Sequence, residues 1–398
     1  MMSLVASVLY AVVFVWLSLM LWIAIDRYRH ERRTSRMAEL KQRLSGSSPD
    51  DMSAVRDIVS ELTVEQLDTV LLDGLSPAME IAIAPAMEER SAELLREAHG
   101  GGSVWQRISA VRVLAAARSD LRYEVLDTML RSGTPVLGAA SIRILAKIDT
   151  RQSAELLIKA LRDGVYSRSR IAAAIDTMSV ARADLLATLF DASEPEALFW
   201  AAKLAGRLNA REWTSRIREF AIEADPLVRR AAIEALGSLG DMTDIALLIF
   251  TMSDPVPFVR AHAARASVRL ADAETIDALV GLLTDRHWIV RAAARDGLAR
   301  LGGAALTAVQ QALWHSDRFA ADSAAEILVR TGGAANAARQ ILHAILHDGA
   351  ATRRQSSVLA RFLAVAGPHL RAAFLGQLSA GEGRVLMGHL EPASAPAE

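Results

Sequence analysis

The sequence predicts an all-α protein, in which one transmembrane helix precedes a long solenoid of stacked helix pairs. Three observations support this fold class. Alanine and leucine, both strong helix formers, are abundant, whereas aromatic residues make up only 5% of the chain. An uncharged apolar stretch occupies residues 3–25. A period of 31 residues recurs later in the chain, as the spacing of Arg229, Arg260 and Arg291 shows.

Bulk properties limit the possible functions. A chain of 398 residues exceeds one ordinary core, which favours several domains or one repeat array. The formal net charge of −1 provides no overall attraction for nucleic acid or for an anionic membrane. Because cysteine is absent, disulfides, thiol catalysis and cysteine-ligated zinc are excluded.

Residues 3–25 are predicted to form the transmembrane helix. At about 1.5 Å per residue they span roughly 34 Å, enough to cross a hydrocarbon core of about 30 Å. A cleaved signal peptide is the alternative, but no basic residue precedes the apolar run and no A-x-A site follows it. Small residues at Ser3, Ser7 and Ala11 would permit self-association of this helix, although a helix that only faces lipid is favoured.

Residues 26–49 are predicted to be a basic juxtamembrane linker. Its basic residues are Arg27, Arg29, Arg32, Arg33, Arg36, Lys41 and Arg43. The positive-inside rule then places the N-terminus outside and the solenoid in the cytoplasm, at the plasma (inner) membrane of a bacterium.

Residues 50–103 are expected to form about three helices that cap the solenoid. Thr63 and Gln66 have the spacing of a capping box, and Ser76 with Pro77 is typical of another helix start. The glycines at 100–102 predict a loop.

Residues 104–390 are predicted to be the repeat solenoid, followed by a disordered tail at 391–398. Weaker copies of the repeat begin near residues 105, 135, 167, 198, 319 and 351, so we expect eight or nine repeats. Each repeat comprises a helix A, a turn with Asp and often Pro, and a helix B. The Asp is expected to cap helix B, and Gly240 and Gly302 to end it.

The D-P-x-V-R-x-x-A-x-x-A-L-x-x-L-G pattern resembles HEAT repeats of the short bacterial type, which also occur in phycobilisome-lyase-like proteins. The resemblance covers about residues 105–365 and is strongest over 225–302. It implies an α-α superhelix and a structural ladder between successive repeats, formed by Asp225, Arg229, Asp254, Arg260, Asp285 and Arg291. Trp200 and Gly138 lie near the Arg position of earlier repeats, which puts the ladder in doubt there.

The sequence contains no motif that indicates catalysis. A phosphate-binding loop, a dinucleotide fingerprint and a nucleophile elbow are all absent. His343 and His347 lie one helical turn apart but lack the H-E-x-x-H pattern. We therefore predict no catalytic residue, no cofactor and no metal.

Arginines on helix B are the candidate partner-binding residues. Arg207, Ser238, Arg269 and Arg300 follow one another at intervals of 31 residues, with Arg265 and Arg295 nearby. Helix B usually lines the concave face of such solenoids, where extended partners bind. The alternative, which is favoured, is that these arginines pair with Glu234, Asp296 and other acids and only keep the face soluble.

Trp288 occupies the position that Pro226 and Pro257 hold in the neighbouring repeats. It is either an exposed binding anchor or buried against the next repeat, and burial is the slightly favoured alternative.

The preferred functional hypothesis is a non-enzymatic, membrane-anchored scaffold that binds a protein within a membrane-associated complex, in envelope assembly or signalling. The resemblance to phycobilisome-lyase-like proteins implies an alternative, a lyase- or oxidoreductase-linked helper. Nucleic-acid binding through the arginines is a third hypothesis, which the membrane segment and the near-neutral charge argue against.

Overall fold

The computed structural model describes residues 16, 20, 38–39, 42–44, 46–180, 183–223, 225–347 and 353–390. Within these ranges the chain forms helices joined by turns, without a β-strand, which confirms the predicted all-α class. The chain divides into two compact units, unit 1 (residues 1–180) and unit 2 (residues 181–398).

Several predicted segments fall largely outside the described residues. Of the predicted transmembrane helix at 3–25 only residues 16 and 20 are described, and Ser3, Ser7 and Ala11 are not. Most of the linker at 26–49 and all of the tail at 391–398 are also outside. Among the helices that are described, none combines the length and apolar character that a membrane span requires.

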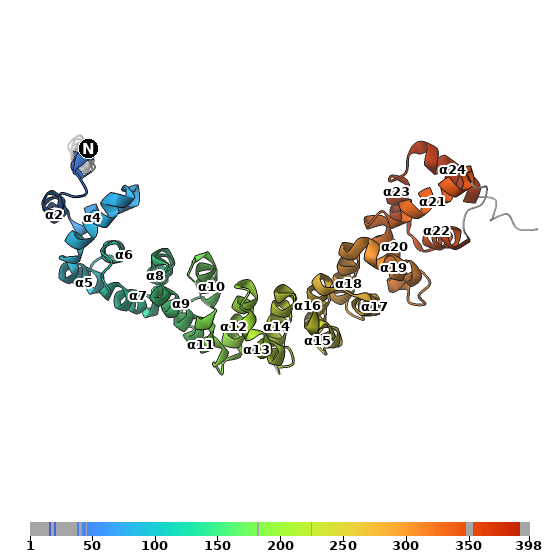
Figure 1. Ribbon diagram of the computed structural model, residues 1–398, viewed down its shortest axis with the longest axis horizontal. Coiled ribbons are helices and arrows are strands. Elements are labelled where there is room, and N and C mark those ends of the chain that lie inside the picture. Colours follow the sequence, from blue (N-terminus) through green and yellow to red (C-terminus); the bar gives the residue numbers. More distant parts are fainter. Residues whose placement is uncertain are drawn as a thin grey trace, which may run out of the picture. The chain divides into compact units, whose positions relative to one another are not determined.

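Unit 1 consists of α-helices in its described part (Figure 1). They are α2 (Met52–Glu61), α3 (Val64–Asp73), α4 (Pro77–Glu88), α5 (Ser91–His99), α6 (Val104–Ala116), α7 (Leu121–Arg131), α8 (Pro135–Ile148), α9 (Arg151–Asp163) and α10 (Arg168–Thr177).

Helices α3 and α4 start where local sequence signals predict. Thr63 and Gln66 form the expected capping box of α3, and Ser76 caps α4 ahead of Pro77. Residues 50–103 contain four helices instead of about three. The additional helix, α5, follows a turn at Arg90, whose guanidinium donates to the backbone oxygens of Val59 and Leu62.

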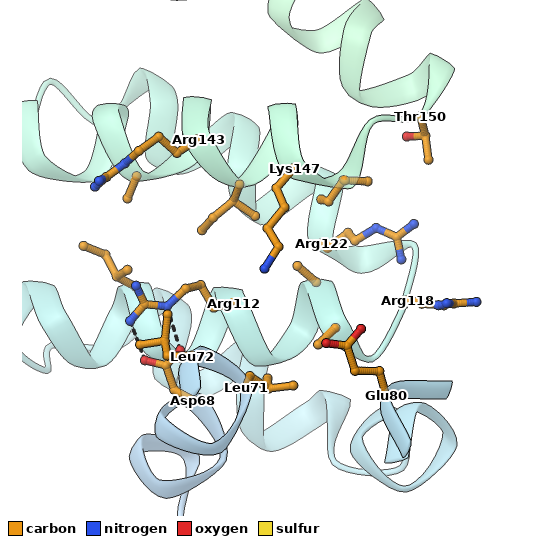
Figure 2. Close-up of a pocket in the computed structure, with 16 residues that line it drawn as sticks. Asp68, Leu71, Leu72, Glu80, Arg112, Arg118, Arg122, Arg143, Lys147 and Thr150 are labelled. Atoms are coloured by element: carbon orange, nitrogen blue, oxygen red, sulfur yellow. Dashed lines mark hydrogen bonds and ion pairs between the residues drawn. The ribbon is translucent and has the colours of Figure 1, made fainter. Parts of the chain in front are cut away.

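Helices α6, α8 and α10 are helices B, and each packs against the next. Helices α3, α4 and α5 of the capping segment contact α6. A buried polar contact joins the capping segment to α6 (Figure 2). Asp68 of α3 accepts a hydrogen bond of 2.6 Å from Ser109 and forms a two-pronged ion pair with Arg112. The carboxylate is almost fully buried, so its charge depends on these partners for compensation.

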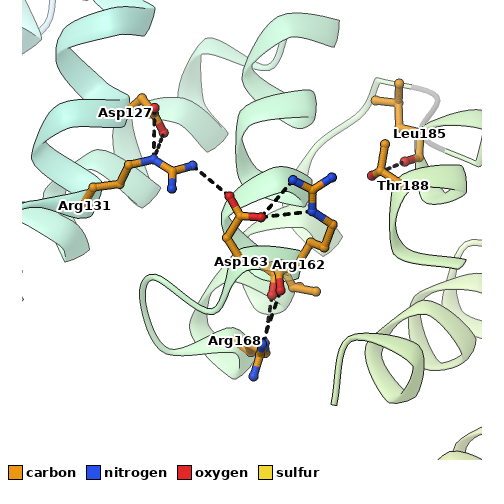
Figure 3. Close-up of polar contacts among 8 residues, drawn as sticks. Asp127, Arg131, Arg162, Asp163, Arg168, Leu185 and Thr188 are labelled. Carbon is orange, nitrogen blue, oxygen red and sulfur yellow. Dashed lines mark hydrogen bonds and ion pairs between the residues drawn. The ribbon is translucent and has the colours of Figure 1, made fainter. Parts of the chain in front are cut away.

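The helices A of unit 1 are connected by a second polar contact (Figure 3). Arg131 of α7 pairs with Asp127 at 2.9 Å and with Asp163, at the end of α9, at 3.2 Å. Burial raises the pKa of Asp163, but hydrogen bonds from Arg162 and Arg131 outweigh this effect and lower it overall. The ionised carboxylate therefore links two successive repeats.

Unit 2 also consists of helices in its described part. The α-helices are α11 (Ala187–Phe190), α12 (Pro195–Arg207), α13 (Thr214–Phe220), α14 (Pro226–Leu239), α15 (Ile245–Thr251), α16 (Pro257–Ser267), α17 (Ala273–Gly281), α18 (Trp288–Leu301), α19 (Leu306–Ala312), α20 (Arg318–Arg330), α21 (Gly333–His347), α22 (Arg353–Val365), α23 (Pro368–Leu375) and α24 (Ala380–Leu390). Short 3-10 turns are η1 (Asp184–Leu186), η2 (Arg211–Trp213), η3 (Met242–Asp244), η4 (Val268–Leu270), η5 (Leu282–Thr284) and η6 (Gly302–Ala305).

Helices α12, α14, α16, α18 and α20 stack side by side as helices B, and the helix A of each repeat packs against its helix B (Figure 1). The helices α12, α14, α16 and α18 begin at Pro195, Pro226, Pro257 and Trp288, which are 31 residues apart. In α14 the predicted stripe of Val228, Ala232, Leu236 and Leu239 is buried. The 31-residue period therefore corresponds to one helix pair.

Two glycines let neighbouring helices B approach closely. A Cβ atom on Gly237 of α14 would lie 2.9 Å from the Cα atom and 3.0 Å from the backbone oxygen of Ala266 in α16. A Cβ atom on Gly206 of α12 would lie 2.8 Å from the Cα atom of Ala235 in α14. Side chains larger than hydrogen would therefore separate these helices.

The Asp and Arg side chains that the resemblance assigned to a ladder make contacts between successive repeats. Arg229 of α14 pairs with Asp254 at 2.7 and 3.0 Å, and Arg260 of α16 pairs with Asp285 at 2.8 and 3.0 Å. All four side chains are buried or nearly so. Each pair is bidentate, the arrangement in which an Arg–carboxylate contact is strongest.

The two ends of the ladder differ from its middle. Asp225 accepts hydrogen bonds from the backbone N–H groups of Leu227 and Val228 and so caps α14. Arg291 donates to the backbone oxygen of Asp285 at 2.7 Å and lies over the ring of Phe319, 4.3 Å from its centroid.

The expected capping role of the turn aspartates is correct for Asp225 but wrong for Asp254 and Asp285. The N-caps of α16 and α18 are Val256 and His287, two residues after each aspartate. Each of these carboxylates accepts only one backbone N–H, because both of its oxygens also bind an arginine of the preceding helix B. At the other end of helix B the prediction holds, since Gly240 and Gly302 follow the last residues of α14 and α18 with positive φ.

The last four helices depart from the regular stack. Helix α20 contacts α21, α22 and α23, and α21 contacts α22, α23 and α24. Side chains bridge this segment to earlier helices: Gln377 donates to the backbone oxygen of Val329, and Arg361 to that of Leu313, both at 2.9 Å. These helices cover the end of the stack, as the last element of a solenoid must.

Candidate partner-binding face

Polar side chains form two rows along the stacked helices B of unit 2. The first row is Lys203, Glu234, Arg265 and Asp296, and the second, about one turn later, is Arg207, Ser238, Arg269 and Arg300. Members of each row are 31 residues apart, so they occupy equivalent positions on α12, α14, α16 with η4, and α18. These eight residues are called the helix-B face below, and all are exposed or half-buried.

Glu234 is the centre of the charge contacts on this face. Its carboxylate lies 2.7 Å from Nδ1 of His262 and 3.7 and 3.8 Å from Lys203 and Arg230. Burial raises the pKa of Glu234, but the hydrogen bond from His262 and the nearby positive charges outweigh burial and lower it. Lys203 and Arg230 also lie over the ring of Phe199. This part of the face is therefore electrically balanced.

Three arginines of the face lack such compensation. Arg265, Arg269 and Arg300 are exposed and form no ion pair with any residue that the structure describes. Arg207 is exposed as well. The two acids that sequence analysis paired with these arginines have other partners: Glu234 contacts His262, and Asp296 pairs with Arg330 at 2.8 Å.

Arg295 does not belong to this uncompensated group. It is half-buried and pairs with Glu326 of α20 at 2.9 Å. Glu326 lies one repeat later, so this contact helps to hold α18 against α20 and leaves Arg295 less available for a partner.

Trp288 is 71% exposed, so the favoured alternative of burial against the next repeat is wrong. It is the first residue of α18, whereas Arg300 lies in the last turn, about 18 Å away along the helix axis. The structure thus places Trp288 at the turn edge of the solenoid, apart from the arginines. Sequence analysis missed three other exposed aromatic side chains of unit 2, Phe250, Trp314 and Phe319.

The described residues contain no group of three or more His, Asp or Glu side chains arranged to hold a metal ion. No arrangement among them favours the lyase- or oxidoreductase-linked alternative.

Comparison with known families decides the nature of the repeats. Residues 183–266, 224–299 and 246–329 each match a family model described as HEAT repeats. The chain is similar to HEAT repeats over residues 183–329. The matched segments cover helices α11–α19 and nearly all of α20, which is the part of unit 2 where the helices B stack most regularly.

Solved structures that are similar to this chain share little of its sequence. An engineered protein is 16% identical, with 83% of this chain and 98% of the other covered and a TM-score of 0.38. The karyopherin Kap121p bound to Nup53p is 12% identical over 92% of this chain and 48% of its own, with a TM-score of 0.48. Human deoxyhypusine hydroxylase in complex with glycerol is 14% identical over 62% and 97%, with a TM-score of 0.26.

This chain therefore spans about half the length of the karyopherin. No protein among the curated ones matches the sequence. The similarity of residues 183–329 to HEAT repeats rests on the family model alone.

Proposed function

We propose that this protein is a non-enzymatic scaffold, anchored in the plasma (inner) membrane by residues 3–25, whose HEAT solenoid binds a protein partner on the cytoplasmic side. The partner would belong to a membrane-associated complex, in envelope assembly or signalling. Confinement to one membrane raises the effective concentration of two proteins toward each other, so a solenoid of modest affinity could suffice. The repeats are proposed to be of the short bacterial type.

The helix-B face is the observation that carries this proposal. It combines three uncompensated arginines with a balanced cluster around Glu234, in register on stacked helices. Such a pattern of charge gives specificity and a fast association rate toward a complementary surface. Because Arg265, Arg269 and Arg300 are already exposed, binding an acidic partner would not require breaking an existing ion pair.

A protein partner fits this face better than a nucleic acid does. Glu234 and Asp296 lie between the arginines, and both would repel a phosphate backbone. Binding of nucleic acid also relies on a continuous basic surface, whereas the chain as a whole carries a net charge of −1.

Replacing Arg269 with glutamate places a negative charge opposite an acidic partner, and we expect the recovery of the partner to fall about tenfold. This change corresponds to a loss of about 1.4 kcal/mol of binding free energy. The tagged chain would be purified from detergent-solubilised membranes, and co-purifying proteins would be quantified by mass spectrometry. The control variant is Arg384→Glu, which reverses an exposed arginine on α24. Equal recovery of all proteins by the two variants would contradict the role of the helix-B face.

The membrane topology is expected to be N-out, because the basic residues follow the apolar segment and do not precede it. A phosphatase reporter that is active only outside the cytoplasm, fused to the C-terminus, should be inactive, whereas a fluorescent reporter that folds in the cytoplasm should be bright. An active phosphatase fusion would overturn the proposed location. Recovery of both fusions in the soluble fraction would overturn the anchor.

A further inference from the structure

A groove of about 630 Å³ lies in unit 1 between the helices B α6 and α8, with α3 and α4 at its side (Figure 2). Its volume is in the range of known ligand sites. Its apolar lining includes Ile108 and Ala115 of α6 and Ile144 and Ile148 of α8. Leu72 of α3, also part of the lining, is 62% exposed.

The packing of the helices B explains why a groove exists at this place. In unit 2, α12, α14 and α16 meet at Gly206 and Gly237, where no side chain holds the backbones apart. Helices α6 and α8 contact each other less extensively than these helices do, and isoleucine side chains of both line the space between them. The lining residues of α6 extend from Ile108 to Ala116, about 12 Å along the helix axis.

Positive charges line this groove from end to end. Arg118, Arg143 and Lys147 are exposed and form no ion pair with any described residue. In Figure 2, Arg143 and Arg118 lie toward opposite ends, and Lys147 projects between α8 and α6. Arg143 and Lys147 are one helical turn apart, a spacing at which like charges destabilise a helix.

The acids of the groove do not compensate these charges. Asp68 is already neutralised by Arg112, which leaves Glu80 as the one other acidic side chain in the lining. Besides the Asp68–Arg112 pair, the lining thus contains one acidic side chain, Glu80, and four basic ones, Arg118, Arg143, Lys147 and the buried Arg122.

Arg122 provides an independent indication that the groove receives an anion. Its side chain is only 8% exposed, and its Nε and Nη1 atoms have no hydrogen-bond partner among the described residues. Nη2 donates to the hydroxyl of Tyr123 at 3.0 Å, which supplies no negative charge. A buried guanidinium without a counter-charge is costly, so an anion bound nearby would stabilise it.

We propose that the groove between α6 and α8 binds a short segment of another protein in which acidic side chains alternate with apolar ones. The apolar side chains would contact Ile108, Ile144 and Ile148, and the carboxylates would pair with the cations on either side. An extended segment of four residues spans about 13 Å, which matches the lined stretch of α6. A ligand with a single anionic head would leave the cations at one end of the groove without partners, which is why a segment with several carboxylates fits better.

This site is independent of the helix-B face, because it lies in unit 1 and shares no residue with that face. An experiment that refutes the role of the groove therefore does not refute the role of the helix-B face, and the reverse also holds. Peptide binding that Lys147→Glu abolishes and Arg269→Glu does not affect would assign the activity to the groove.

The first test identifies the sequence class that the groove selects. The full chain in lipid nanodiscs is presented with a phage library of random octapeptides, with counter-selection against the Arg143→Glu/Lys147→Glu double variant. We expect the enriched peptides to contain two or more Asp or Glu residues that alternate with Leu, Ile or Phe. Enrichment of peptides without acidic residues, or no enrichment at all, would overturn the proposal.

The second test measures affinity with the most enriched peptide, labelled with a fluorophore, by anisotropy. Lys147→Glu is expected to weaken binding at least tenfold, whereas Lys159→Glu should change it less than twofold. Lys159 is the matched control, since it is exposed on α9 and does not line the groove. Unchanged circular dichroism of both variants would show that they fold.

Two other occupants would give distinct results, and each would contradict the proposal. If the natural ligand is a small amphiphilic anion, decanoate should raise the thermal stability of the chain but not that of the Lys147→Glu variant. In that case no peptide would be enriched from the library. If a second copy of this chain occupies the groove, the chain should self-associate, and Lys147→Glu should abolish this self-association.

Discussion

Replacement of Arg260 by alanine is expected to destabilise the protein by about 3–5 kcal/mol. Arg260 and Asp285 are 8% and 10% exposed, and the guanidinium also donates to the backbone oxygen of Asp254. Its removal would leave a buried carboxylate without its counter-charge. The free energy of unfolding would be measured by urea titration, with far-UV circular dichroism as the signal, because the described chain is helical.

The control for this change is Arg318→Ala. Arg318 pairs with Asp322 at 3.4 Å, but its side chain is 90% exposed, and exposed pairs contribute at most about 1 kcal/mol. A similar loss of stability in both variants would mean that burial is not what makes the Arg260–Asp285 pair important.

The same pair also predicts a dependence on pH. Burial raises the pKa of Asp285, but the hydrogen bonds from Arg260 and from the backbone of His287 outweigh it, so the pKa lies below its usual 3.8. The stabilisation is then fully present above about pH 4 and is lost as the pH falls through the lowered pKa. In Asp285→Asn this part of the acid sensitivity should disappear.

Introduction of a methyl group at Gly237 is the second change with a large expected effect. In Gly237→Ala the new Cβ atom would lie closer than 3 Å to the Cα atom of Ala266, so α14 and α16 must move apart. Overpacking of this kind costs about 1–3 kcal/mol. We expect a lower thermal midpoint by circular dichroism and faster hydrogen exchange in α14 and α16.

Gly281→Ala is the matched control for the glycine change. Gly281 ends α17, and a Cβ atom there would meet nothing within 4 Å. Alanine in a compatible helical position usually stabilises a protein by about 0.4–1 kcal/mol. If Gly281→Ala destabilised the protein as much as Gly237→Ala, close helix approach would not explain the effect.

The stack of helices B could be predicted because its cause is local and repeated. The same apolar stripe recurs every 31 residues, as Val228, Val259 and Val290 show, so equivalent residues meet equivalent neighbours. The caps of α16 and α18 were predicted wrongly because the turn aspartates do not keep one distance from helix B. Asp225 lies one residue before the start of α14, whereas Asp254 and Asp285 lie three residues before the starts of α16 and α18.

Only part of the candidate site could be predicted from the sequence, because side-chain partners come from neighbouring helices. The spacing of Arg269 and Arg300 predicted that they share a face, but the partners of Glu234 and Arg295 come from neighbouring helices and depend on side-chain reach. The groove in unit 1 has no sequence signal of its own. Its residues come from several helices, and its volume depends on how far α6 and α8 stand apart.

The ladder also affects how such a chain can grow or shrink during evolution. Arg229 and Arg260 each bind an aspartate 25 residues later, in the turn of the next repeat. Duplication of one 31-residue module from 226 to 256 would therefore supply both a new arginine and a new aspartate in register. Gains and losses of whole modules keep each of these Arg–Asp pairs complete, whereas loss of one partner alone leaves a buried charge unmatched. The length of this solenoid can thus change in steps of one helix pair without a compensating mutation elsewhere.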